Sequence, residues 1–138
     1  MYWNKNETQY LKKIYANVLS RKTPYFRRPL TINHKPTNIC IIKLTKHDNY
    51  LEKIGGFSEI DNNLCFLIQH LNKFDTFLFN TSTDILATDI QHRVIKIIPN
   101  VSPDNILHLT KKTHNVWVFK VGIINAHKIK LNDLVYTH

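Results

Sequence analysis

The chain has 138 residues, 43% of them hydrophobic, and carries 19 Lys and Arg against 10 Asp and Glu, a formal net charge of +9. A chain of this length fits one domain that needs no disulfide or metal to fold. No run approaches the roughly 20 apolar residues of a membrane span, and no secretory signal opens the sequence. We therefore expect a soluble, cytoplasmic protein, with organellar import as the open alternative.

The positive charge is concentrated near the N-terminus. Residues 1–35 contain eight Lys or Arg and one acid, whereas residues 36–138 contain eleven and nine. In the first segment Leu11, Ile14, Tyr15 and Val18 recur at helical spacing, which predicts an amphipathic helix over residues 7–20. The helix should end before Pro24, because proline disfavours helical geometry in the residue that precedes it.

A basic arm follows the predicted helix, and its three prolines favour an extended, irregular chain. Cations with interleaved aromatic side chains can neutralise phosphates and stack on bases, so the arm is a candidate surface for nucleic acid or another polyanion. The alternatives are a helix packed on the domain with its lysines solvated, a targeting segment and a membrane-surface helix. The candidate polyanion-binding residues are Lys12, Lys13, Arg21, Lys22, Tyr25, Arg27 and Arg28.

After Pro36 the pattern changes to short apolar runs, many rich in β-branched or aromatic residues, which predict strands. A loop at residues 89–92 should form a hairpin although it lacks glycine, and Gly55 and Gly56 should form a turn. Single helical turns are expected near residues 49–54 and 125–130. The expected strands are residues 38–44, 64–69, 75–79, 84–88, 93–98, 106–109, 115–121 and 134–137. The sequence thus predicts a mainly β domain over residues 36–138 behind an N-terminal helix and arm over residues 1–35.

Three blocks of this region share a pattern with a known family. The first runs from Phe74 through Asp84 and Asp89 to an Asn-Val-x-Pro stop at residues 100–103. The second, residues 116–135, contains Gly122, Ile129, Asp133 and Val135, and the third and weakest is residues 50–57. In this order and spacing the blocks, which span residues 38–137, resemble the DUF192 family (UPF0127) of small proteins of unassigned function.

The resemblance implies a compact, mainly β barrel or sandwich with short helices, and it implies no known chemistry. The chain departs from the family pattern at three positions. Phe79 stands where the family has Met, Val118 where it has Glu, and Asn132 where it has Gly. Any family site that uses those residues is altered here.

Few residues are candidates for chemistry. Cys40 and Cys65 lie in apolar runs and read as buried core residues, with no metal-binding spacing among the Cys and His residues. Asp84 and Asp133 could accept backbone N–H bonds that hold turns, or could face a ligand. The candidate ligand-binding residues are Thr76, Asn80, Asp84, Gly122 and Asp133. No metal and no cofactor is predicted.

Two functions of different classes follow. The first is a non-enzymatic binding or accessory module that uses the surface near residues 76–84 and Gly122. The alternative is a protein associated with nucleic acid or ribonucleoprotein, in which the basic arm makes the contacts. An enzyme would require Asp84 and Asp133 to share one pocket, and we favour a non-enzymatic protein. The partner protein and the oligomeric state stay open, because fold does not fix function.

Overall fold

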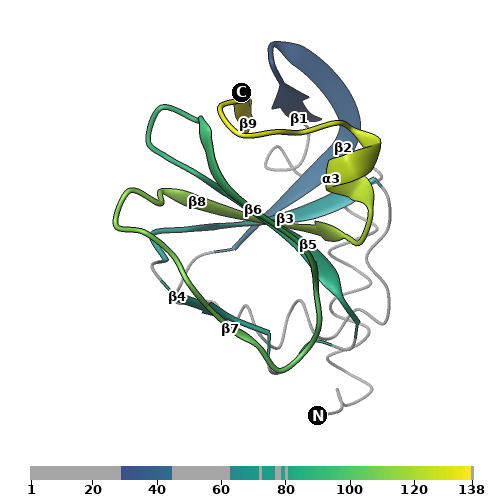
Figure 1. Ribbon diagram of the computed structural model, residues 1–138. Helices are drawn as coiled ribbons and strands as arrows, with labels where there is room; N and C mark the ends of the chain where they lie inside the picture. The colour runs from purple at the N-terminus through teal and green to yellow at the C-terminus, as the bar shows by residue number, and fades with distance from the viewer. Residues whose placement is uncertain (1–28, 45–62, 72, 77–78, 80, 138) are drawn as a thin grey trace.

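The computed structural model describes residues 29–44, 63–71, 73–76, 79 and 81–137. In this part of the chain strands dominate, and the helix is a single turn (Figure 1). The elements are β1 (Pro29–Ile32), β2 (Lys35–Leu44), β3 (Leu64–Gln69), β4 (Lys73–Asp75), β5 (Thr83–Thr88), β6 (Val94–Val101), β7 (Ile106–His108), β8 (Asn115–Lys120), α3 (Ile123–Ala126) and β9 (Val135–Thr137). The protein is mainly β, as predicted.

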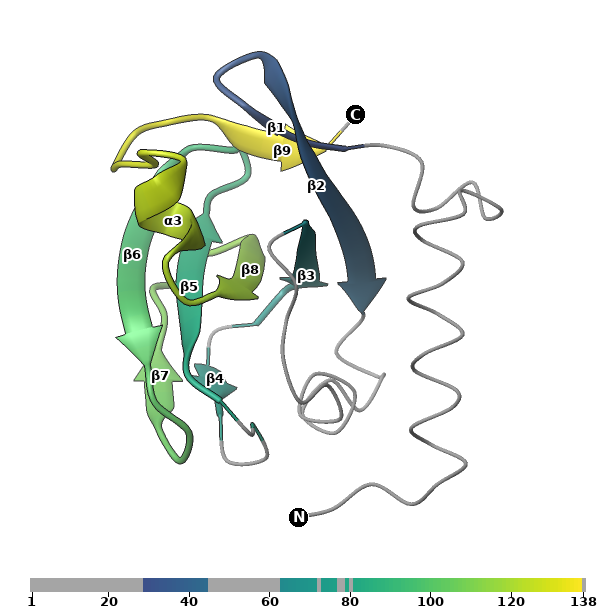
Figure 2. The ribbon, with the colours of Figure 1, turned by 90° about the vertical axis from the view of Figure 1, so that its right-hand side faces the viewer.

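Seven strands form one sheet in the order β6-β5-β8-β3-β2-β1-β9. All its neighbours are antiparallel except β2 and β3, which run parallel with Ile42 opposite Phe66. A separate ribbon pairs β4 with β7, and it lies at the opposite end of the molecule from β1 and β9 (Figures 1 and 2). At one end the outer strands β6 and β9 approach each other through a bridge between Arg93 and Leu134. Among the described residues they share no longer ladder, so the sheet is not closed along its length.

Both faces of the central strands β3 and β8 are buried, which explains why these two strands are almost continuously apolar. On β8, Val116 and Val118 enter one hydrophobic cluster, whereas Trp117 and Phe119 enter the other. The first cluster includes Phe74 and Leu109 from the β4–β7 side of the domain. The second is covered by side chains of β1, α3 and β9: Leu30, Ile123, Ile124 and Val135. Both clusters therefore depend on β8, the strand between β5 and β3.

The two cysteines are free thiols. Cys65 is fully buried in the second cluster, as predicted, whereas Cys40 is half-buried against the first. Their side chains thus lie on opposite faces of the sheet, which prevents a disulfide between them. Burial raises the pKa of the Cys65 thiol well above its ordinary value, so this thiol stays protonated and unreactive near neutral pH.

The sheet begins before the domain boundary predicted at residue 36. Residues 29–35, assigned to the arm, contain β1 and the turn into β2, and Thr31 pairs with Pro36 inside the sheet. Prolines in this segment suggest irregular chain, but Pro29 is the first residue of its strand, a position that needs no donated hydrogen bond. The domain therefore includes residue 29. The expected N-terminal helix and the turn at Gly55 and Gly56 lie outside the described residues.

Some strands and helices begin or end at other residues than predicted. The strand expected at residues 75–79 overlaps β4 only at Asp75, and residues 77 and 78 lie outside the described part of the chain. The helical turn expected at residues 125–130 begins at Ile123 and ends at Ala126. The loop at residues 89–92 forms the predicted hairpin turn. His92 adopts a positive φ of 68° there, the conformation for which glycine is the usual residue. Among the described residues no helix is long and apolar enough to cross a membrane.

Candidate functional site

Asp84, a candidate from the sequence, is the centre of a buried hydrogen-bond hub. Its side chain is 2% exposed, near the start of β5. Oδ1 accepts the backbone N–H of Asn100 at 2.8 Å, and Oδ2 accepts the N–H groups of Gly122 at 2.9 Å and Ile124 at 3.3 Å. The carboxylate thus joins the end of β6 and the entry to α3 to β5. It performs the turn-holding role expected as one of its two possibilities.

Gly122 has a conformational reason to be glycine. Its φ is +95°, and a Cβ built on it would meet no atom within 4 Å. We expect Gly122→Ala to lower the free energy of unfolding by about 1–2 kcal/mol through backbone strain alone. Gly122→Asn should cost less, because asparagine tolerates positive φ. Urea denaturation followed by circular dichroism measures both, and an Ala variant as stable as wild type would contradict this account.

Thr76, a second candidate, is fully buried and holds the β6–β7 connection. Its hydroxyl donates to the carbonyl of Ser102 at 3.0 Å and accepts the backbone N–H of Asn105 at 3.0 Å. Its own N–H donates to the Asn105 carbonyl at 2.9 Å. The hydroxyl is therefore engaged by the protein itself. Asn80, the neighbouring candidate, lies outside the described residues.

Asp133 lies away from Asp84. Its Oδ2 accepts the backbone N–H of Lys130 at 2.9 Å, and its carbonyl accepts the N–H of Val94 at 2.8 Å. Val94 pairs with Thr88 at the end of β5, whereas Asp84 is near the start of that strand. The two carboxylates consequently do not form one site, and the pair on which an enzymatic reading depended is not assembled.

Three turns that are distant in sequence meet at one end of the sheet, the end at which Asp133 lies. The Asn33 N–H donates to the Leu134 carbonyl at 2.8 Å, and the Leu134 N–H donates to the Asn33 side chain at 2.8 Å. The Val135 N–H donates to the His92 carbonyl at 2.9 Å. We name this surface the hairpin end, and it comprises residues 33–36, 89–93, 127–134 and 136.

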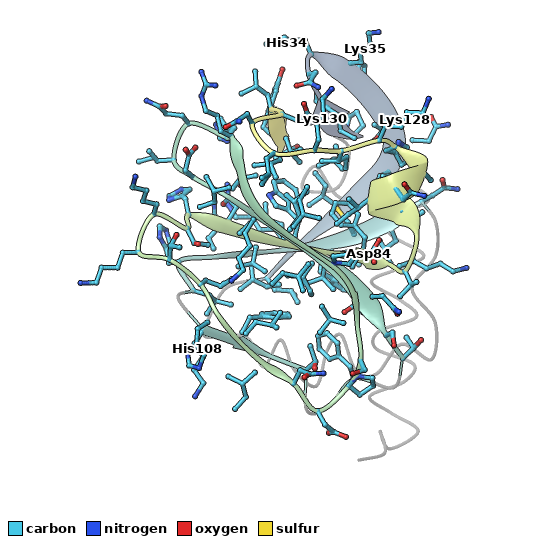
Figure 3. All side chains as sticks on the ribbon, in the orientation of Figure 1. His34, Lys35, Asp84, His108, Lys128 and Lys130 are labelled. Carbon is cyan, nitrogen blue, oxygen red and sulfur yellow. The ribbon has the colours of Figure 1, made fainter. Side chains whose placement is uncertain are left out.

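The hairpin end presents four exposed cations and no exposed carboxylate. Its two acids are less exposed than the cations: Asp133 is buried, and Asp89 is half-buried with Oδ1 accepting the N–H groups of Gln91 and Arg93. Figure 3 shows His34, Lys35, Lys128 and Lys130 of this surface in the upper part of the view, with His108 at the lower left. The four cations are Lys35, Arg93, Lys128 and Lys130. Their charge is therefore available to an anionic ligand.

Sequence reasoning did not find this surface, because its members come from three segments with no shared motif. Only the prediction of the hairpin loop at residues 89–92 and of a structural role for Asp133 pointed to it. The residues predicted to bind polyanions, Lys12 to Arg28, lie outside the described part of the chain. Within the described residues, no three His, Cys, Asp or Glu side chains are grouped closely enough to hold a metal ion.

The domain is thus a mainly β scaffold with a buried hydrogen-bond hub at Asp84 and a basic surface at the hairpin end. Its fold is similar to that of known proteins. No family model and no curated protein matches the sequence. Two crystal structures share the fold. One, a protein of unknown function from Novosphingobium aromaticivorans, is 17% identical with a TM-score of 0.68, over 78% of this chain and 83% of that one.

The other structure is described as a "putative transcription regulator" from Sinorhizobium meliloti. It is 9% identical with a TM-score of 0.71, and the match covers 84% of this chain and 97% of that one. At these identities the likeness is one of fold alone. It places the β architecture of this chain among known domains of similar size.

Proposed function

We propose that this protein is a non-enzymatic binding module on a divergent DUF192-like domain, and that it binds anionic polymers through the hairpin end. The single observation that carries the proposal is the gathering of four exposed cations from three turns, with both local carboxylates engaged by backbone N–H groups. Such an arrangement attracts phosphate or sulfate groups, because four exposed cations outnumber the two less exposed acids.

The family part of the proposal is supported by the Asp84 hub. Asp84, Asn100 and Gly122 come from two separate blocks of the resemblance, and their hydrogen bonds meet at one carboxylate. These three residues match the family pattern at positions that are far apart in the sequence, and their hydrogen bonds hold the same part of the fold together. The barrel or sandwich form that the resemblance implies belongs to the same proposal, and the contact between β6 and β9 supports it.

We propose the hairpin end as the binding surface in preference to the residues predicted from sequence. A ligand-binding role for Thr76, Asp84, Gly122 and Asp133 stays a prediction, but the side-chain oxygens of the three polar residues already bond to the protein's own backbone. The basic arm stays a second prediction for polyanion binding. The description of the Sinorhizobium meliloti protein as a "putative transcription regulator" is compatible with either surface.

The test compares full-length variants that lose equal charge at different places. The first carries Gln at the four hairpin-end cations, and a matched control carries Gln at four exposed lysines elsewhere: Lys43, Lys73, Lys111 and Lys112. A third carries Gln at Arg21, Lys22, Arg27 and Arg28 of the arm. Binding to a fluorescent heparin fragment and to a labelled 12-nucleotide single strand is measured by anisotropy across a salt series, after circular dichroism has confirmed folding.

We expect the hairpin-end variant to bind the single strand at least about 10-fold more weakly, with the salt slope reduced by about 3 because four phosphate contacts are lost. The matched control should change by less than about 3-fold. If the control weakens binding as much as the hairpin-end variant, the attraction is only net charge and the proposal is wrong. If the arm variant alone abolishes binding, the arm is the binding surface instead.

A further inference from the structure

Three aromatic rings from separate segments are grouped on the hairpin end. The ring of Tyr136 in β9 is near two imidazoles, with centroid distances of 6.1 Å to His34 of the β1–β2 turn and 5.7 Å to His92 of the β5–β6 turn. His34 Nδ1 and the Tyr136 hydroxyl form a hydrogen bond of 3.0 Å. Both histidines are exposed and Tyr136 is half-buried. We name these three residues the ring cluster.

The backbone holds the ring cluster in an unusual conformation. Asn33, His34 and His92 have positive φ values of 49°, 69° and 68°. For a residue other than glycine this conformation carries a free-energy cost, although Asn and His tolerate it better than most. Backbone hydrogen bonds to the β9 segment, from Asn33 to Leu134 and from Val135 to His92, fix both turns. The two imidazoles are therefore positioned before any ligand arrives, which lowers the entropy lost on binding.

We infer that the ring cluster stacks on the bases of single-stranded nucleic acid while the surrounding cations contact its phosphates. The inference rests on the proposed function and names its ligand. A positively charged surface that also carries exposed aromatic rings is the usual composition of a single-strand site, where each stacked base adds affinity with little sequence preference. A duplex keeps its bases stacked inside, and heparin has none, so neither can use the rings.

The decisive probe pair is a labelled 12-nucleotide oligothymidylate and an abasic 12-mer with the same phosphates. We expect the full-length wild-type protein to bind the thymidylate about 10-fold or more tightly than the abasic strand, the contribution of one or two stacked bases. Tyr136→Ala should reduce that preference, taken as the ratio of the two affinities of the same variant, to within about 2-fold. Tyr136→Phe should keep the preference, since it retains the ring and loses only the hydroxyl bond to His34.

The outcomes separate this inference from the proposed function. Equal wild-type affinity for the thymidylate and the abasic strand, or for single and double strands, overturns the stacking inference and leaves the anionic surface standing. No binding to either strand or to heparin overturns the proposed function itself. Because the wild-type comparison needs no substitution, equal affinity overturns the inference even where the Ala variant folds poorly. A preference that persists in a folded variant without the Tyr136 ring also overturns it, since the stacking would then belong to other aromatic residues such as Tyr25 of the arm. Tyr136→Leu is the second variant that removes the ring, and it keeps apolar packing.

Discussion

Replacing Asp84 with Ala is expected to lower the free energy of unfolding by about 3–5 kcal/mol, because three backbone N–H groups lose a charged acceptor in a buried place. The substitution also creates a small cavity beside the second cluster. Since the carboxylate joins β5, β6 and α3, its loss should loosen the covering of one face of the sheet. Chemical denaturation of the full-length variant, followed by circular dichroism, measures the change.

A conservative substitution at Asp84 and a control substitution at Asp104 complete the test of the Asp84 hydrogen bonds. Asp84→Asn keeps one acceptor oxygen but turns an NH2 group towards a backbone donor, so we expect it to cost about 2–3 kcal/mol. Asp104→Asn removes an exposed carboxylate at a positive φ that Asn tolerates, and we expect a change within about 0.5 kcal/mol. An Asp84→Ala protein as stable as the Asp104→Asn control would mean that the hub is not structural.

Trp117→Ala is the second substitution with a large expected effect, also about 3–5 kcal/mol. Trp117 is 1% exposed and belongs to the second cluster, and its indole N–H donates to the buried Thr88 hydroxyl at 3.1 Å. Removal of the ring leaves a cavity in the second cluster, next to the strand that contributes to both clusters. It also leaves the Thr88 hydroxyl without the indole N–H donor. The free energy of unfolding from urea titration is the readout.

Two further substitutions separate the contributions of ring packing and of the indole hydrogen bond to the free energy of unfolding. Trp117→Phe keeps most of the apolar ring, so we expect it to retain at least half of the stability that Ala loses. Thr88→Val keeps the shape of the neighbour and leaves the indole N–H without its acceptor, which should cost about 1–3 kcal/mol. If Trp117→Ala and Trp117→Phe were equally destabilising, the hydrogen bond rather than ring packing would dominate at this position.

The strands could be predicted where the sequence signal is local. Leu64–Gln69 was predicted to the residue because a run of apolar residues buried on both faces is bounded by polar ones. Pro29–Ile32 was missed because its membership of the sheet depends on pairing with β2 and β9, which no local pattern records. The helical turn at Ile123 was displaced by two residues, since its start is set by the bonds of Asp84 from 40 residues away.

For the candidate site too, some features could be predicted from the sequence and others could not. The possibility that Asp84 and Asp133 hold turns could be stated from their residue type, because carboxylates readily accept backbone N–H bonds. The hairpin end could not be predicted, because Lys35, Arg93 and Lys128 are unremarkable in their own segments. They share one surface only through hydrogen bonds between turns that are separated by 40 to 100 residues, such as the pair between Asn33 and Leu134.

The most direct test of the binding surface is a titration of the isotope-labelled full-length protein with 12-nucleotide oligothymidylate, followed residue by residue in its amide NMR spectrum. We predict that the largest shifts occur at residues 33–35, 89–93, 127–134 and 136, the residues of the hairpin end that have a backbone N–H. Shifts that instead gather near residues 76–84 and Gly122, or in the basic arm alone, would contradict the assignment of the hairpin end as the binding surface.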